Sequence, residues 1–102
     1  MILKNLMDKI LVEREKKDIN DGFGIEECWD KMVELLSKNT NETIEYLQNC
    51  SEEEIYFISE VFEDISDRLQ SPEYILCLRE LEKKFPDLDL AKDVDLAERY
   101  LN

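Results

Sequence analysis

Carboxylates are the most abundant side chains in this sequence that could take part in chemistry, since 26 of the 102 residues are Asp or Glu. A catalytic carboxylate needs an apolar pocket that raises its pKa, and a domain of this size has little room for both a core and a substrate pocket. The sequence contains no histidine, which excludes Ser-His-Asp and Cys-His arrangements. We therefore predict that the protein is not an enzyme.

Cysteine spacing and the absence of histidine also argue against a metal site. The three cysteines are Cys28, Cys50 and Cys77. No two of them have the spacing of a zinc motif, and carboxylates are unusual ligands for structural zinc. No phosphate-binding loop occurs in the sequence either. We predict no metal and no cofactor, and we expect reduced cysteines that act as small apolar residues.

The segment 18–22, Asp-Ile-Asn-Asp-Gly, places acids before a glycine as calcium-binding loops do. When Gly22 takes the obligatory glycine position, however, Lys17 and Ile19 take the first and third ligand positions. Neither of these side chains is a calcium ligand. We expect a polar turn here, in which Gly22 and Gly24 supply positive φ angles.

Apolar residues recur at the three- and four-residue steps of amphipathic helices along most of the chain. No alternating pattern bounded by turn residues predicts a strand. The expected helices carry apolar stripes at 3–11, 29–36 and 44–47, extend over about 51–69 and 72–85, and finish with a stripe at 94–101. Short connections favour antiparallel neighbours. We predict one all-α domain over residues 1–102, a compact bundle or short stack of about six helices, with no sheet.

Capping residues indicate where several helices begin. Ser51 with Glu54 has the spacing of a capping box, which predicts the start of a long helix. The dipeptide 71–72, Ser-Pro, has the order of an N-cap and a first helical residue. Thr40 is expected to cap the third helix and Asp89 the last one.

Negative charge is concentrated in the C-terminal part of the chain. The net charge is −13, of which residues 1–39 contribute −2 and residues 40–102 contribute −11. No basic residue occurs between Lys38 and Arg68, and that interval holds nine acids. A surface this negative repels phosphate backbones and anionic membranes and attracts basic proteins. We therefore predict a basic protein partner, and no binding to nucleic acid or to membranes.

The predicted helix at 51–69 has two distinct faces on a helical wheel. Its apolar face holds Ile55, Ile58, Phe62, Ile65 and Leu69, with Val61 at the edge. Its acidic face and flank hold the residues that we predict to bind the partner, namely Glu53, Tyr56, Phe57, Glu60, Glu63, Asp64 and Asp67. The acids would attract a basic partner, and the two aromatic residues would anchor it.

Three interpretations of this face remain open from the sequence. Acids in the first helical turn interact favourably with the helix dipole and need no partner. Glu60 and Asp64 lie beyond that turn and are four residues apart, so their repulsion costs roughly a few tenths of a kcal/mol. The face is a docking surface, a solvated surface, or one side of a helix that packs on both sides and buries Phe57.

Three segments within the C-terminal part of about 60 residues carry a resemblance to known proteins. They are Glu60-Val61-Phe62-Glu63-Asp64-Ile65-Ser66, Phe85-Pro86-Asp87-Leu88-Asp89-Leu90 and Asp95-Leu96-Ala97-Glu98-Arg99-Tyr100. The chain resembles short acidic helical proteins of Gram-positive bacteria, some of which are immunity proteins encoded beside polymorphic or contact-dependent toxins. The resemblance implies an inhibitor that binds its cognate toxin at or beside the active site. Many such toxins are basic nucleases, so an acidic face would imitate the charge of nucleic acid.

Two hypotheses for the function follow. The first is an immunity-type inhibitor that neutralises a basic bacterial toxin through the acidic helical face. The alternative is a structural or adaptor domain, or a homodimeric scaffold, with no inhibitory role and with acids that only maintain solubility. The N-terminal residues lack the unbroken apolar run of a signal peptide, so we expect a cytoplasmic protein. The oligomeric state stays open in both hypotheses.

Overall fold

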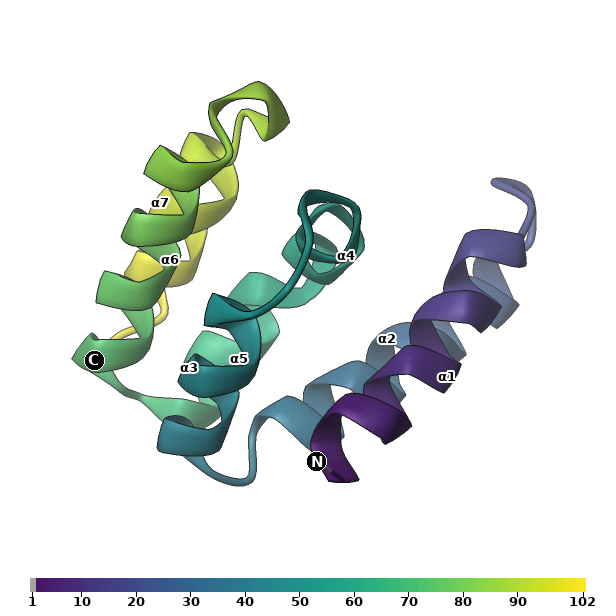
Figure 1. Cartoon of the computed structure of the whole chain (residues 1–102), viewed down its shortest axis with the longest axis horizontal. Coiled ribbons are helices and arrows are strands. Elements are labelled where there is room, and N and C mark those ends of the chain that lie inside the picture. Colours follow the sequence, from purple (N-terminus) through teal and green to yellow (C-terminus); the bar gives the residue numbers. More distant parts are fainter. Residues whose placement is uncertain (1) are drawn as a thin grey trace.

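Every regular element of the structure is a helix within residues 2–102, the part of the chain that the computed structural model describes. The α-helices are α1 (Ile2–Lys16), α2 (Gly22–Leu36), α3 (Thr40–Gln48), α4 (Glu52–Ile58), α5 (Phe62–Leu69), α6 (Pro72–Lys84) and α7 (Ala91–Arg99). Two 3₁₀ helices, η1 (Ser59–Val61) and η2 (Pro86–Leu88), connect α4 to α5 and α6 to α7. Figure 1 shows the α1–α2 pair on one side, α6 and α7 on the other, and α3, α4 and α5 between them. The prediction of an all-α fold without a sheet is confirmed.

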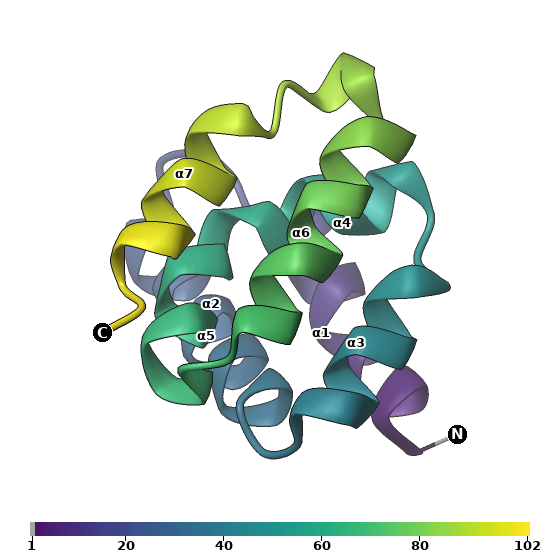
Figure 2. The ribbon, with the colours of Figure 1, turned by 90° about the vertical axis from the view of Figure 1, so that its left-hand side faces the viewer.

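The core runs through all seven α-helices because each contributes one apolar stripe. Its largest fully buried side chains include Met7, Met32, Leu36, Leu47, Ile55, Ile58, Phe62, Ile65, Tyr74 and Leu78. Three buried hydroxyls join neighbouring helices by donating to backbone carbonyls, and the first is Thr43 Oγ1 of α3, which donates to Leu36 O of α2 at 2.8 Å. The Tyr74 hydroxyl donates to Phe62 O at 3.0 Å, and Ser66 Oγ donates to Ala97 O at 2.6 Å. The last two bonds hold α6 and α7 against α5, and Figure 2 shows the three helices together.

Two of the predicted caps are present. Ser51 Oγ accepts from the Glu54 amide at 3.2 Å while a Glu54 carboxylate oxygen accepts from the Ser51 amide at 2.8 Å, which completes the capping box. Ser71 Oγ accepts from the Tyr74 amide at 3.2 Å, with a proline at the first turn of α6. The cap of α3 lies one residue earlier than predicted, because the Asn39 side chain, rather than Thr40, accepts from the Glu42 amide.

Two predictions about turn residues are wrong. Asp89 does not cap α7: it ends η2 in the left-handed conformation, with φ of 53°, and the N-cap position of α7 falls to Leu90. The two glycines at 22 and 24 do not have positive φ, since both lie in the first turn of α2. Asp21 caps that helix by accepting from the Gly24 amide at 3.0 Å. A Cβ on Gly24 would collide with the Asp21 carboxylate, so the glycine leaves room for the cap.

The prediction of a single helix over residues 51–69 is also wrong, because the helix is interrupted at η1. Val61 leaves the helical region, with φ of −123° and ψ of 13°, and α5 begins at the next residue. Ser59 Oγ donates to Tyr56 O at 2.6 Å within the last turn before the break. The rotation between successive residues changes there. The predicted apolar face is nevertheless confirmed, since Ile55, Ile58, Val61, Phe62 and Ile65 are fully buried and Leu69 is partly buried against the core.

Candidate functional site

The break at η1 distributes the seven predicted partner-binding residues over several parts of the surface. Glu53, Tyr56 and Phe57 lie on α4, next to α1. Glu60 belongs to η1. Glu63, Asp64 and Asp67 lie on α5. The continuous acidic strip expected from the sequence therefore does not exist, and each group has its own surroundings.

Glu60 is an internal ion-pair partner rather than an open acid. Its two carboxylate oxygens accept from Arg14 Nε at 2.8 Å and from Arg14 Nη2 at 2.7 Å, and Oε1 also accepts from Trp29 Nε1 at 2.9 Å. The side chains of Arg14 and Glu60 are only 14% and 24% exposed. The hydrogen bonds that Arg14 donates to Glu60 raise the pKa of Arg14. This cluster joins α1, α2 and η1, so Glu60 stabilises the fold.

Phe57 is half-buried and packs against the core, where the wheel had placed it opposite the core. The Arg14 guanidinium covers one side of its ring, 5.3 Å from the centroid. Tyr56 is exposed and contacts the Phe57 ring edge-on, with centroids 5.2 Å apart. The part of the helix around Phe57 therefore packs on two sides, and Tyr56 is the aromatic residue of the pair that remains open to solvent.

Glu53 lines a shallow groove of about 340 Å³ between α1 and α4. The groove has an apolar floor and acidic walls, and its lining residues are Asp8, Leu11, Val12, Glu15, Glu53, Glu54 and Phe57. Two of its acids already have partners, because Asp8 pairs with Lys4 at 2.8 Å and Glu54 belongs to the capping box. This groove is less available to a basic partner than its composition indicates.

Asp64 and Asp67 line a second groove, of about 490 Å³, between α2 and α5. We name it the acidic groove; its lining residues are Glu26, Trp29, Asp30, Val33, Asp64, Asp67 and Arg68. Its four acids are exposed, and within residues 2–102 none of them forms an ion pair or a side-chain hydrogen bond. Trp29 forms part of the wall while its N–H is held by Glu60. The acidic groove thus offers four free carboxylates beside an indole ring.

Glu63 does not line the acidic groove, and Asp93 of α7 is one of the charges that act on it. Glu63 is half-buried, and burial, then Asp64 and Asp93, raises its pKa. Asp93, on α7, is half-buried as well, and burial together with Asp89 raises its pKa. These two carboxylates therefore oppose each other across the α5–α7 contact instead of facing a partner.

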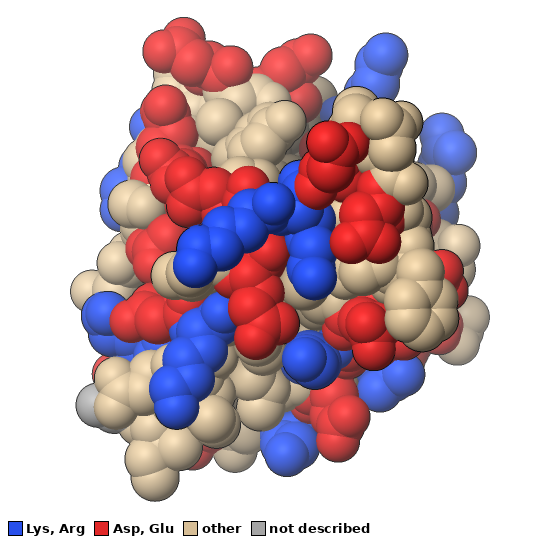
Figure 3. Space-filling view, turned by 90° about the vertical axis from the view of Figure 1, so that its right-hand side faces the viewer, with Lys and Arg blue, Asp and Glu red and all other residues tan. Residues whose placement is uncertain are grey.

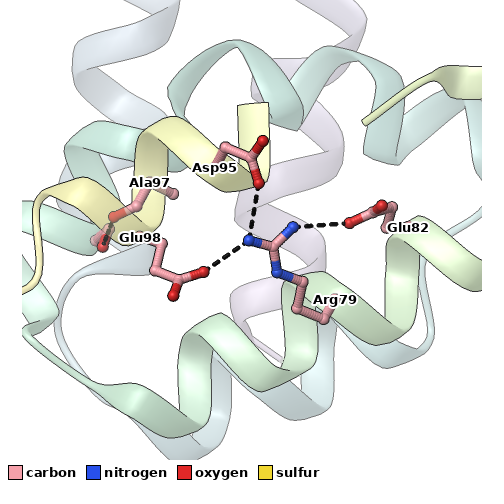
Figure 4. Close-up of polar contacts among 6 residues, drawn as sticks. Arg79, Glu82, Asp95, Ala97 and Glu98 are labelled. Atoms are coloured by element: carbon pink, nitrogen blue, oxygen red, sulfur yellow. Dashed lines mark hydrogen bonds and ion pairs between the residues drawn. The ribbon is translucent and has the colours of Figure 1, made fainter. Parts of the chain in front are cut away.

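Arg79 pairs with three acids of the C-terminal helices, as Figure 4 shows. Its guanidinium donates to Glu82 at 3.1 Å, to Asp95 at 2.9 Å and to Glu98 at 2.6 Å, which ties α6 to α7. On the side of the molecule formed by α1 and α2, Lys and Arg lie between the acids (Figure 3). Within residues 2–102, six acids thus have ion-pair partners, whereas the four acids of the acidic groove have none.

Glu26, Asp30 and Trp29 were not predicted as site residues. They have a signal in the sequence, because two acids four residues apart flank the tryptophan on the same face of one helix. The helical pattern does not show which helix lies opposite that face. The packing of α2 against α5 brings them to Asp64 and Asp67, and this pairing comes from the tertiary fold.

No protein-family model, curated protein or solved structure matches this chain. In the part of the chain that the structure describes, no group of three or more His, Cys, Asp or Glu residues is arranged to hold a metal ion. None of the helices in that part is long and apolar enough to cross a membrane. The function has to be inferred from the chemistry of the surface.

Proposed function

We propose that the protein binds a basic protein partner through the acidic groove, as an immunity-type inhibitor that neutralises a bacterial toxin. The observation that carries the proposal is the set of four exposed, unpaired carboxylates around Trp29. Like charges gathered in one place repel one another and gain energy when a cation comes between them. Arg68 also lines the groove, but within residues 2–102 it forms an ion pair with none of the four acids, so their charges stay available to the cations of a partner.

The groove fits arginine or lysine side chains in particular. A guanidinium can pair with a carboxylate through two parallel hydrogen bonds, and it also stacks on an aromatic face such as that of Trp29. The net charge of −13 steers such a partner toward the protein from a distance, mainly by raising the association rate. Tyr56, on α4 and outside the lining of the acidic groove, is an exposed aromatic residue that can add a further contact.

A toxin that cleaves nucleic acid must hold phosphates and therefore carries basic residues at its active site. An inhibitor with aligned carboxylates occupies the same basic residues by imitating the charge of the substrate. The resemblance to acidic helical immunity proteins supports this form of the proposal. No catalytic step belongs to this chain in the proposal, because inhibition requires only that it covers the partner's surface.

Growth rescue tests the proposal directly. Expression of the toxin domain encoded beside this chain should stop the growth of a bacterial host, and coexpression of the chain should restore it. The variant Asp64→Lys/Asp67→Lys should fail to rescue because it repels the partner. The control Glu45→Lys/Glu80→Lys changes the charge equally on exposed positions of α3 and α6 and should still rescue. Equal rescue by both variants would refute a role for the acidic groove.

A second candidate is a structural or adaptor domain that contacts its partner through apolar residues. Ile19 and Phe23 favour it, since both are largely exposed at the connection between α1 and α2. The dependence of partner binding on salt concentration distinguishes the two functions. Association through the acidic groove should weaken as ionic strength rises, whereas an apolar contact should persist or strengthen.

A further inference from the structure

Trp29 connects the acidic groove to the ion pair of Arg14 and Glu60. Its ring is half-buried, packs against the core and lines the groove between α2 and α5. Its one polar group, the indole N–H, donates to Glu60 Oε1 at 2.9 Å. The same oxygen accepts from Arg14 Nε at 2.8 Å. The ring is therefore held both by the core and by a carboxylate that is itself fixed.

The hydrogen bond to Glu60 determines what Trp29 offers to a ligand in the groove. Because the indole N–H is occupied, the ring has no donor left for the acids of the groove. Without Glu60, the N–H would lack an acceptor and would gain by turning toward one of those acids. The contact with Glu60 thus leaves the four carboxylates free and leaves the carbon surface of the ring as Trp29's part of the groove wall.

A guanidinium uses both components of such a groove, whereas an ammonium uses mainly the charge. The guanidinium is planar and weakly hydrated, pairs with a carboxylate through two hydrogen bonds and stacks on aromatic rings. The lysine ammonium is a compact, strongly hydrated point charge. The protein holds its own Arg14 in this way, with two hydrogen bonds to Glu60 and the Phe57 ring centroid 5.3 Å away. The acidic groove offers the same two kinds of contact to a partner.

Arg68 leaves this position in the groove open. It is exposed and lines the groove. Within residues 2–102 it neither forms an ion pair with the four acids nor lies over the Trp29 ring. The carboxylates and the ring are therefore available together to an arginine of the partner.

We infer that Glu60 is a positioning residue for binding: by holding Trp29 it makes the acidic groove select arginine over lysine side chains. The inference rests on the proposed function, since it names which basic side chain of the partner enters the groove. Glu60 acts through Trp29 and does not itself pair with the partner. A carboxylate that stabilises the fold thereby also determines specificity.

Isothermal titration calorimetry with nona-arginine and nona-lysine peptides tests the inference. The readout is the ratio of the two affinities, because the attraction of the net charge of −13 acts on both peptides. At about 20 mM NaCl the wild type should bind nona-arginine about fivefold more tightly than nona-lysine. Glu60→Ala and Trp29→Leu should each lower this ratio by roughly twofold or more. The double variant should lower it no further than Trp29→Leu does, because Glu60 acts through Trp29.

Two control variants separate positioning from stability. Glu60→Gln keeps an oxygen that can accept from the Trp29 N–H, so it should retain the wild-type ratio although the ion pair with Arg14 is lost. Arg79→Ala removes the ion pairs between α6 and α7, which do not involve Trp29, and should also retain it. Circular dichroism checks that each variant is folded.

A measurement on the wild type serves if Glu60→Ala does not fold. The Trp29 indole N–H should stay protected from exchange with water in NMR spectra when nona-arginine binds, while the protons on the ring carbons shift. An N–H that becomes exposed on binding, or ring protons that do not shift, would overturn the inference.

The outcomes distinguish this inference from the proposed function. Equal affinity of the wild type for the two peptides, or an unchanged ratio in folded Glu60→Ala, would overturn the inference. The proposed function would still stand if Asp64→Asn/Asp67→Asn weakened the binding of both peptides. If that variant bound both peptides as the wild type does, the proposed function would fail together with the inference.

Discussion

Glu60 and Asp64 are four residues apart in the sequence, yet their carboxylates have opposite surroundings. Glu60 is enclosed by Arg14 and Trp29 and links three elements of the fold. Asp64 lines an open groove and has no ion-pair partner within residues 2–102. The comparison shows that the number of acids in a segment does not measure how much of its charge is available. A single arginine from a distant helix converts one acid into a structural residue.

The largest expected effect is the loss of stability when the enclosed acid is removed. Glu60→Ala should lower the free energy of unfolding by about 2–3 kcal/mol, because it leaves the Arg14 charge and the Trp29 N–H without their acceptor. Urea unfolding measures this loss of unfolding free energy. Asp64→Ala should stay within about 0.5 kcal/mol of the wild type, as surface substitutions do. Equal effects of the two substitutions would contradict the distinction between them.

A double substitution measures how strongly Arg14 and Glu60 are coupled. Arg14→Leu and Glu60→Leu should each destabilise the protein, because each leaves one charge of the pair without its partner. The double variant should lose less unfolding free energy than the two single variants lose in sum. The difference should be about 1–3 kcal/mol, since residues in direct contact couple in this range. A double-mutant cycle from urea unfolding gives the coupling. Additive losses would mean that the ion pair does not connect α1 to η1.

The smallest expected effect concerns pH and the opposed carboxylates of α5 and α7. Burial raises the pKa of Glu63 and of Asp93 in the folded state. The folded protein therefore binds these protons more tightly than the unfolded chain does. Their contribution to stability is present below the ordinary pKa values and is lost as pH rises through the raised ones.

Glu63→Gln/Asp93→Asn should remove this dependence. At pH 7 the variant should be more stable than the wild type by roughly a few tenths of a kcal/mol, because two repelling charges are gone. As pH falls the difference should shrink, because the raised pKa values let the wild-type carboxyls take up protons in the folded state. Urea unfolding at pH 7 and at lower pH tests this prediction. A variant that is less stable at pH 7 would show that the two acids have favourable contacts.

Local signals in the sequence predicted most of the helices and two of their caps. The capping box at Ser51 and the Ser-Pro start of α6 depend on residues within one turn, so they are visible in the sequence. No proline or glycine marks the break at η1 in the sequence. The break coincides with the contacts of Glu60 to Arg14 and Trp29, which are 46 and 31 residues away in the sequence.

The candidate site was predicted only in part for the same reason. Asp64 and Asp67 were identified as site residues because they belong to an acidic run without a basic residue between Lys38 and Arg68. Their counterparts Glu26 and Asp30 belong to another helix, and only the tertiary packing brings them into the same groove. Composition reveals an excess of charge, but the pairing of helices determines where that charge is free.

Fluorescence of Trp29 provides the most direct measurement of the central claim, because it is the only tryptophan of the chain and it lines the acidic groove. Titration with a nona-arginine peptide at about 20 mM NaCl should change its emission to saturation. Asp64→Asn/Asp67→Asn should weaken binding at least tenfold, whereas the control Glu45→Gln/Glu80→Gln, with the same change of charge, should bind as the wild type does. If both variants bind the peptide equally, the acidic groove is not the docking surface.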